Sequence, residues 1–372
     1  MPGTLIVSLD FELFWGMLDV CPLEEYRSHV LGGRKAIPQL LALFQKYGIH
    51  ATWAAVGFLF ADNKSELEIF CPAKKPTYKN AKIAPYEYLA GVGENEMDAP
   101  CFFAPSLLKM IAQTPDQEVG SHTFSHYYCR EPGQTPAQFA QDMAAAKAIA
   151  KAKDYDLTSV ILPRNQCEPE YTEVLRQAGF TAYRDEENDW IHEKIRFRPL
   201  LRALRLLDVY LPLTGQGGYT PKNEGGIWNL TGSRMYKPIL HPLAFLEGLK
   251  LHRIKRQMLH AAKNGLTFHL WWHPHNIGVD TQAHLKQLEE IFITPSCKKS
   301  TECAALTWAR PPGCWKKRDI YESDARSELP DLFRRGEGGL PDHPCLSGRS
   351  GDGLLQPGKR YRPENGGSPG GN

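Results

Sequence analysis

The chain alternates between short apolar segments rich in β-branched and aromatic residues and longer segments with helical periodicity, from Thr4 to about Phe292. This alternation is typical of βα units built around a parallel sheet. It predicts an α/β fold and leaves open whether the strands form a barrel or an open, doubly wound sheet. Strands are expected at Thr4–Leu9, Ala51–Phe58, Ser159–Leu162, Phe180–Tyr183 and Leu266–Trp272.

Amphipathic helices are expected between these strands, because apolar residues recur there at helical spacing. Gly48 supplies a stop for the first helix, and Thr135 followed by Pro136 supplies an N-cap and a first-turn proline for the second. The helices are expected over Ala36–Phe44, Ala137–Lys153, Glu168–Ala178 and Leu243–Ala262.

Two long irregular segments, Ala61–Pro105 and Arg184–Asn229, are expected to be loops over the sheet that form the walls of a substrate site. From about Pro295 the composition shifts to glycine, proline, arginine and serine, which cannot offset the entropy of ordering. We therefore expect one folded domain over residues 1–296. Residues 297–372 are expected to form a low-complexity, disordered tail, with partner binding as the alternative.

Part of the second irregular segment, Arg196–Leu213, mixes arginines with many leucines. We expect a helix packed on the domain, with its arginine side chains reaching into solvent. The alternative is a helix that lies on a membrane surface, near a lipid-linked sugar.

Composition narrows the class of protein. With 372 residues, of which 42% are apolar and 23% charged, the chain can bury a large core. Its formal net charge of +2 provides no field that would by itself recruit nucleic acid or an anionic membrane, and no segment approaches the ~20 apolar residues of a membrane span. The cysteines number nine and never have C-x-x-C spacing, so neither a zinc ribbon nor a disulfide framework is expected. The N-terminus does not have the pattern of a signal peptide, which predicts a cytoplasmic protein with reduced thiols.

His122 and His126 form the strongest local motif, directly after the short apolar pair Val119-Gly120. Spaced by four residues, they would project from one side of a helical turn and converge on one divalent cation. By itself, an H-x-x-x-H motif is more often accidental than metal-binding. The hypothesis therefore needs a second element.

Asp10 and Glu12 supply that element where the first strand ends. Residues two apart on a strand point to the same side, so both carboxylates would face one spot. Their neighbours Leu9, Phe11 and Leu13 are apolar, which argues against an ordinary solvated strand end.

Two further polar elements lie at or just beyond the carboxyl ends of expected strands. Arg164 follows the strand that ends at Leu162, and three histidines occur in and after the last strand. His273 shares a strand face with His269, whereas His275 lies beyond a proline. His269 is the candidate for a satisfied core histidine.

These elements, in this order, resemble the polysaccharide deacetylase family, the NodB homology domain of carbohydrate esterase family 4. The resemblance runs from Thr4 to about Phe292. The family's motifs supply a catalytic aspartate with a metal-binding carboxylate, an H-[ST]-x-x-H pair, an arginine beside proline and a final catalytic histidine. The resemblance implies a distorted, seven-stranded (β/α) barrel, and it makes residues 1–296 the catalytic domain.

The chain departs from the family's usual pattern at two motifs. Its two acids are spaced by one residue, as in the intracellular D-x-D/E subgroup, and the sequence around Arg164 reads P-R-N-Q in place of R-P-P-Y. The segment Ile37–Phe58, which includes Trp53, is similar to that subgroup. Trp190 is similar to the family's tryptophan motif.

The resemblance also implies roles for individual residues. Asp10 is the implied catalytic base, Arg164 orients it and keeps it ionised, and His273 protonates the departing amine. Whether Asp10 and Glu12 exchange the roles of base and ligand stays open. The implied metal ligands are Glu12, His122 and His126, and the implied substrate-binding residues are Trp53, Trp190 and His275.

The implied reaction is metal-dependent removal of an acetyl or other acyl group from an N-acylated sugar or glycan precursor. Zinc is the leading candidate for the single divalent ion, and cobalt, nickel, manganese and iron are alternatives. The implied partner is the carbohydrate, and intracellular relatives favour a homo-oligomer. Two other functions stay open: opening of a cyclic imide or ureide such as allantoin, in a closed site, and non-catalytic carbohydrate binding on the same fold.

Overall fold

A row of parallel strands forms the centre of the domain. The structure is a computed structural model that describes residues 3–186, 190–195, 197–294 and 303–306. Neighbouring strands in the order β5, β4, β3, β2, β1, β9 are all parallel, so their carboxyl ends open on one face. The bounds are β1 Gly3–Phe11, β2 Ala51–Ala55, β3 Gln117–Ser121, β4 Ser159–Ile161, β5 Ala182–Arg184 and β9 Thr267–Trp272.

A segment of the chain bridges the two edges of this row. β7 (Ile227–Asn229) pairs in parallel with β5, and β8 (Arg234–Met235) pairs in parallel with β9. Between them, the amide of Leu230 donates to the carbonyl of Tyr183, and the amide of Ser233 donates to that of His269. The β7–β8 segment thus occupies a further strand position between β5 and β9. β6 (Lys222–Glu224) pairs with β7 in the antiparallel direction. The predicted distorted (β/α) barrel is confirmed.

Burial explains why the central strands read as continuous apolar runs. Every residue of β2 is buried, as is every residue of β1 except Thr4. Parallel strands with both faces covered have this pattern. The polar exceptions in β1 are Ser8 and Asp10, which lie toward its carboxyl end.

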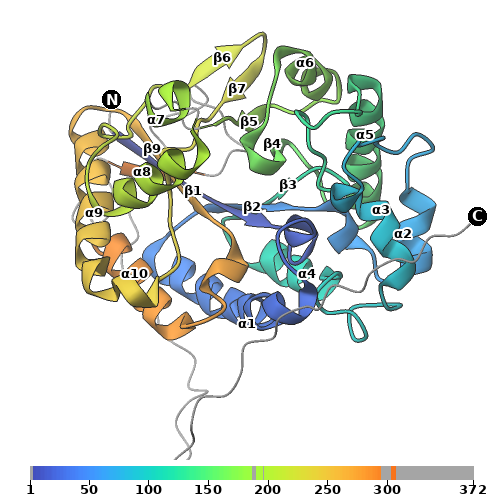
Figure 1. Cartoon of the computed structure of the whole chain (residues 1–372), viewed down its shortest axis with the longest axis horizontal. Coiled ribbons are helices and arrows are strands. Elements are labelled where there is room, and N and C mark those ends of the chain that lie inside the picture. The colour runs from blue at the N-terminus through green and yellow to red at the C-terminus, as the bar shows by residue number, and fades with distance from the viewer. Residues whose placement is uncertain (1–2, 187–189, 196, 295–302, 307–372) are drawn as a thin grey trace, which may run out of the picture. The chain divides into compact units, whose positions relative to one another are not determined.

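Helices cover the outside of the strands (Figure 1). The expected stop at Gly48 is confirmed, since this residue adopts φ = 60°, and Thr135 forms the capping box of α5. α1 begins well before the expected start, because its apolar positions continue back to Val30. The bounds are α1 Leu23–Tyr47, α2 Lys64–Phe70, α3 Pro85–Tyr88, α4 Pro105–Gln113, α5 Pro136–Ala152, α6 Pro169–Gln177, α7 Trp190–Lys194, α8 Arg198–Tyr210, α9 Glu247–Lys263 and α10 Thr281–Phe292.

The two segments expected to be loops contain helices. α2 and α3 lie within Ala61–Pro105, and α7 and α8 lie within Arg184–Asn229 together with β6 and β7. The helix expected over Leu243–Ala262 is divided into a 3-10 helix, His241–Leu246, and α9. The prediction of loops was therefore wrong in detail.

A short strand lies within the expected tail. β10 (Cys303–Leu306) pairs in parallel with the first half of β1, against the prediction of disorder for that stretch. Residues 307–372 lie outside the described residues, so a tail there stays a prediction. Within the described part of the chain, none of the helices has the length and apolar character needed to cross a bilayer.

Candidate metal centre and catalytic site

Glu12, His122 and His126 meet in a buried cluster at the carboxyl ends of β1 and β3. The Nε2 atoms of His122 and His126 lie 3.2 and 2.8 Å from the same oxygen, Oε2 of Glu12. One ligand atom of each residue lies within 4.8 Å of the others, and all three side chains are almost completely buried. Two imidazole nitrogens and one carboxylate oxygen form a donor set that fits a divalent transition metal such as zinc.

The loop that carries the two histidines is not the expected helical turn. β3 ends at Ser121, and Thr123 and His126 adopt positive φ angles of 64° and 57°. These left-handed positions fold the loop back, so both imidazoles reach Glu12. The convergence predicted from the sequence is present, but its structural reason was wrong.

A buried carboxylate from α5 holds this loop. Asp142 accepts hydrogen bonds from the amide of Phe124 at 2.7 Å, from the amide of Ser125 at 3.2 Å and from the Ser125 hydroxyl. The Asp142 side chain is completely buried, and burial raises its pKa to about 7. No motif in the sequence marked Asp142, which lies within the expected helix Ala137–Lys153.

Electrostatics within the cluster favour an ionised glutamate. Burial by itself would raise the pKa of Glu12, but the nearby His273 and His126 and hydrogen bonds from both ligand histidines hold that pKa well below its usual range. Burial lowers the pKa of His126, which favours the neutral imidazole. An anionic carboxylate with a neutral imidazole is the protonation state in which such groups bind a cation.

Asp10 lies beside this cluster and is held by Arg184, at the end of β5. The Arg184 guanidinium donates to both carboxylate oxygens, with Nη1 at 2.8 Å from Oδ1 and Nη2 at 2.6 Å from Oδ2. Burial by itself would raise the pKa of Asp10, but the charge of Arg184 and the neighbouring histidines hold it below its usual value. Asp10 is therefore ionised at neutral pH.

Arg184 is itself fixed from all sides. Its Nε donates to Oδ1 of Asn165 at 2.8 Å, its Nη1 also donates to Ser8 Oγ at 3.0 Å, and its guanidinium carbon lies 4.0 Å from the centre of the Trp271 ring. The side chain is 1% exposed. Arg184 is a rigid positioning residue for Asp10.

Arg164, which the sequence analysis placed beside Asp10, has other partners. Its Nη2 lies 2.6 Å from Oδ2 of Asp19 and its Nη1 lies 3.1 Å from Oε1 of Glu131, with the side chain 40% exposed. Arg164 and Asn165 adopt φ angles of 57° and 52°. The assignment of Arg164 as the arginine that orients Asp10 is corrected: Arg184 takes that place.

His273 lies between the two acids. Its Nε2 atom is 3.7 Å from Oδ2 of Asp10 and 3.6 Å from Oε1 of Glu12, and its side chain is 19% exposed. Asn276 lies 3.3 Å from the other ring nitrogen. His273 thus has one edge toward the two carboxylates and partial access to solvent, and its catalytic role stays a prediction.

His275 lies behind His273 and is buried. The two rings are stacked with their centres 5.0 Å apart, and Nε2 of His275 is 3.9 Å from Oε1 of Glu12. Burial lowers the pKa of His275 to about 3, so the ring is neutral. A Cβ atom at Gly33 would lie 2.7 Å from the Cα of His275, so glycine allows α1 to pack tightly against this turn.

His269 is a buried core histidine with hydrogen-bond partners for both ring nitrogens, as expected. It is completely buried and bonds to the carbonyl of Leu230 at 3.0 Å and to Ser8 Oγ at 2.7 Å. Burial, first of all, and the Arg184 charge lower its pKa to about 3. Through Ser8 it also supports Arg184.

The contacts of the two candidate tryptophans are with residues other than the site's acids and histidines. Trp53 is completely buried, bonds through Nε1 to Gln117 and packs edge-on against Phe11. It is a core residue, so its assignment to substrate binding is corrected. Trp190 begins α7, is exposed, and donates to the carbonyl of Leu213. A substrate contact of Trp190 stays a prediction.

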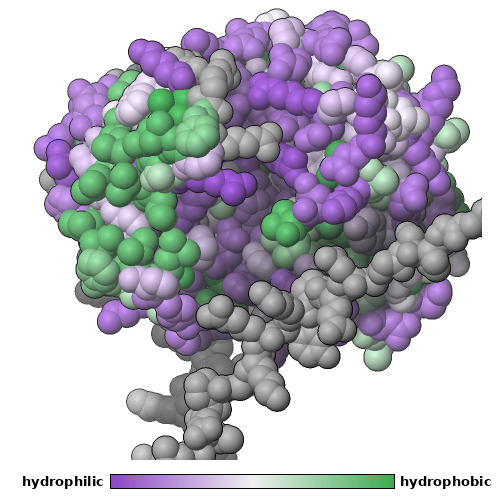
Figure 2. Space-filling model, in the orientation of Figure 1, coloured by the Kyte–Doolittle hydropathy of each residue, from purple (hydrophilic) through white to green (hydrophobic). Residues whose placement is uncertain are grey.

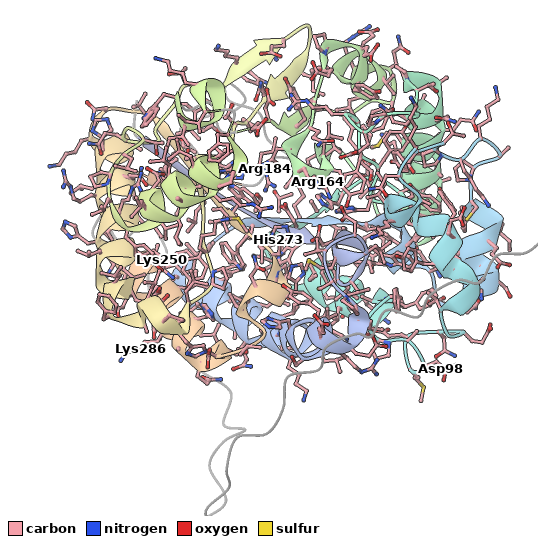
Figure 3. The ribbon with its side chains drawn as sticks, in the orientation of Figure 1. Asp98, Arg164, Arg184, Lys250, His273 and Lys286 are labelled. Atoms are coloured by element: carbon pink, nitrogen blue, oxygen red, sulfur yellow. The ribbon has the colours of Figure 1, made fainter. Side chains whose placement is uncertain are left out.

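The site residues meet at a hollow on one face of the barrel. Figure 3 places Arg164, Arg184 and His273 near the centre of this face. Figure 2 shows a hollow in the same place, with hydrophilic residues around it. Strand ends of a parallel barrel gather functional side chains in this way.

Sequence reasoning missed the network around Asp10, although one signal was present. Arg184 directly follows the expected strand that ends at Tyr183, so it occupies a strand's carboxyl end just as Arg164 does. Choosing between the two arginines required the left-handed backbone at 164 and 165, which periodicity does not predict. Asn165 lies in the expected motif, but its partner was not foreseeable.

The fold and the site together define a distorted (β/α) barrel with a buried Glu-His-His cluster. The polysaccharide deacetylase family model matches residues 19–183, a range that includes His122 and His126 and excludes Asp10, Glu12 and His273. The match agrees with the family that the sequence resembles, over that part of the chain. A comparison with curated protein sequences found no match.

Solved structures with a related fold share little sequence with this chain. Puue allantoinase is 12% identical, with a TM-score of 0.50, over 82% of this chain and 87% of that chain. A Pseudomonas aeruginosa PAO1 protein described as a probable polysaccharide deacetylase is 11% identical, with a TM-score of 0.49, over 82% and 87%. A family 4 carbohydrate esterase from Streptomyces lividans, solved with acetate, is 10% identical, with a TM-score of 0.36, over 82% and 92%. At such identities, the likeness to the allantoinase bears on the fold alone.

Proposed function

We propose that the protein is a metal-dependent N-deacetylase that removes an acyl group from an N-acylated sugar or glycan precursor. The observation that carries the proposal is the convergence of His122 and His126 on one oxygen of Glu12, with Asp10 and His273 beside them. The match of residues 19–183 to the polysaccharide deacetylase family model supports deacetylation as the reaction class.

The metal would be held by Glu12, His122 and His126. When bound, a divalent ion supplies a Lewis acid that polarises the amide carbonyl and makes a water molecule more acidic. Zinc is the leading candidate, since nitrogen and oxygen donors of this kind suit it well.

The remaining residues would move and hold protons. Asp10, kept ionised by Arg184, accepts the proton of the attacking water through a carboxylate oxygen. His273, partly exposed at the hollow, donates a proton from its ring to the departing amine nitrogen. The division between the acids follows their contacts: Glu12 faces both ligand histidines, whereas Asp10 faces the arginine.

An open site favours a sugar as the substrate. The hollow in Figure 2 opens to the surface and has hydrophilic residues around it, which suits the hydroxyl groups of a glycan. A cyclic imide or ureide is small and suits an enclosed site. Because this hollow is open, ring opening of such a substrate ranks second. A homo-oligomer and a cytoplasmic location stay predictions.

The test compares the two reactions on the same preparation. Purified protein is incubated with N-acetylated chitooligosaccharides and, separately, with allantoin, and the release of acetate and the opening of the ring are measured. We expect acetate release that Asp10→Asn abolishes and Arg164→Met leaves within a few-fold. Ring opening without acetate release would select the second candidate, and neither activity in metal-loaded protein would contradict an enzymatic role on these substrates.

A further inference from the structure

Helix α8 has its apolar side exposed. Leu200, Ala203, Leu206 and Leu207 follow one another at helical spacing, and all four are exposed. The exposed fraction of Leu207 is 47%. A surface helix of a globular protein normally has the opposite arrangement, with the apolar stripe against the core.

The inward side of α8 is held by polar contacts, which explains this orientation. Asp208 is buried and accepts hydrogen bonds from the amide of Thr214 at 2.7 Å, from Nη1 of Arg234 at 2.7 Å and from Nη2 of Arg253 at 2.7 Å. Removing this carboxylate from two arginines would be costly. The helix therefore cannot simply rotate to bury its leucines.

A second exposed apolar group continues this surface. The 3-10 helix before α9 exposes Phe245, of which 80% is accessible, and Leu249 follows it in α9. Helix α8 packs beside α9, and Nη2 of Arg253 in α9 donates to Oδ1 of Asp208 in α8. We name the resulting surface the apolar rim: Leu200, Leu206, Leu207, Leu211, Phe245 and Leu249.

The apolar rim lies on the same face as the candidate site. Figure 2 shows hydrophobic residues to the left of the central hollow, where Figure 1 places α8 and, further left, α9. Contiguous exposed apolar surface of this kind marks an interaction site.

Charge on α8 identifies the kind of partner. Arg202 and Arg205 are exposed, and the helix's one acidic residue, Asp208, is buried and paired. Leucines interleaved with exposed arginines, on a helix that lies flat on the protein, match the requirements of an anionic membrane surface. In a symmetric contact with a second copy whose twofold axis crosses α8, Arg202 and Arg205 would lie near their own counterparts, where like charges repel.

We propose that the apolar rim binds the surface of an anionic lipid bilayer, with the mouth of the site facing the membrane. Leu207 and Phe245 would enter the interface between headgroups and acyl chains, while Arg202 and Arg205 contact lipid phosphates. The placement is that of a peripheral protein and needs no membrane-spanning segment. This inference goes beyond the proposed reaction and does not depend on it.

The test is sedimentation of the full chain with vesicles of phosphatidylcholine, with and without phosphatidylglycerol. We expect the wild type to bind the anionic vesicles. Leu207→Glu should reduce this binding about tenfold or more, since it places a charge where an apolar side chain would enter the bilayer. The double variant Arg202→Gln and Arg205→Gln should lose about tenfold or more in affinity for anionic vesicles.

The matched control is Ile69→Glu, which changes another exposed apolar residue, 79% accessible, on α2 outside the apolar rim. It should bind as the wild type does, with an unchanged circular dichroism spectrum in every variant. Absence of wild-type binding to anionic vesicles would overturn the proposal. So would equal loss in Ile69→Glu, or a concentration-dependent dimer that Leu207→Glu dissolves, which would assign the surface to a second copy.

Discussion

Replacing Arg184 with methionine removes the partner of a buried carboxylate while keeping a side chain of similar length. Asp10 would keep its burial but lose both hydrogen bonds from the guanidinium. Breaking a buried pair by removing one member costs roughly 3–5 kcal/mol, because the remaining charge is uncompensated. We expect Arg184→Met to lower the free energy of unfolding by about that amount at pH 7.

The loss should depend on pH in a defined direction. The folded-state pKa of Asp10 lies below its ordinary value of 3.8, so the pair contributes stability above that value and loses it as pH falls through the lowered pKa. In the variant, burial is no longer opposed by Arg184 and raises the pKa of Asp10. Acidification then protonates Asp10, and the cost of its unpaired buried charge disappears. The difference between wild type and variant should therefore be largest near neutral pH and shrink toward acidic pH.

The assay is urea unfolding followed by tryptophan fluorescence across this pH range. Arg164→Met is the matched control, since its ion pairs are 40% exposed on the arginine side and such pairs contribute ~1 kcal/mol or less. The double variant Asp10→Asn with Arg184→Met should be more stable than Arg184→Met alone, because no charge is left unpaired. Equal effects of the two arginine variants, or a pH-independent loss, would refute the assignment of Arg184.

The remaining predictions concern the loop, the core and the metal. Burial raises the pKa of Asp142 to about 7 from its ordinary value of 3.8, so the stability that this group contributes is present at acidic pH and is lost as pH rises through that range. Asp142→Asn should therefore make the melting temperature less dependent on pH between these two values. An unchanged pH dependence of the melting temperature would contradict the account. The same variant should weaken metal binding about tenfold or more by loosening the histidine loop, as measured by competition with a chelating dye. Trp53→Ala should cost about 3–5 kcal/mol in unfolding free energy, whereas exposed Trp190→Ala should cost under ~1 kcal/mol; a Trp190 variant that raises KM alone would support its predicted substrate contact.

The central strands could be predicted because β-branched and aromatic runs have few other stable arrangements. β3 was the exception: its first half, Gln117-Glu118, is polar, and only Val119 marks a strand. Its position follows from pairing with β2, a tertiary contact that a local pattern does not contain.

The two acids could be predicted because they depend on spacing along one strand, whereas the two histidines converge through a left-handed loop that their spacing did not predict. The arginine could not be predicted, because Arg164 and Arg184 follow neighbouring strands and differ only in backbone conformation and packing. The orientation of α8 was hidden for a similar reason. Its periodicity was readable, but the inward side is set by ion pairs of Asp208 with Arg234 and Arg253, far along the chain.

The most direct test of the central claim is the metal content of the purified full chain, measured by elemental analysis beside His122→Ala. Glu12 and His126 would remain in that variant as an incomplete donor set, which binds a divalent ion far more weakly. We predict close to one equivalent of a divalent transition metal in the wild type and strong loss in His122→Ala, with both proteins folded by circular dichroism. Equal metal content in the two proteins, or none in the wild type after loading with zinc, cobalt, nickel, manganese or iron, would contradict the metal centre.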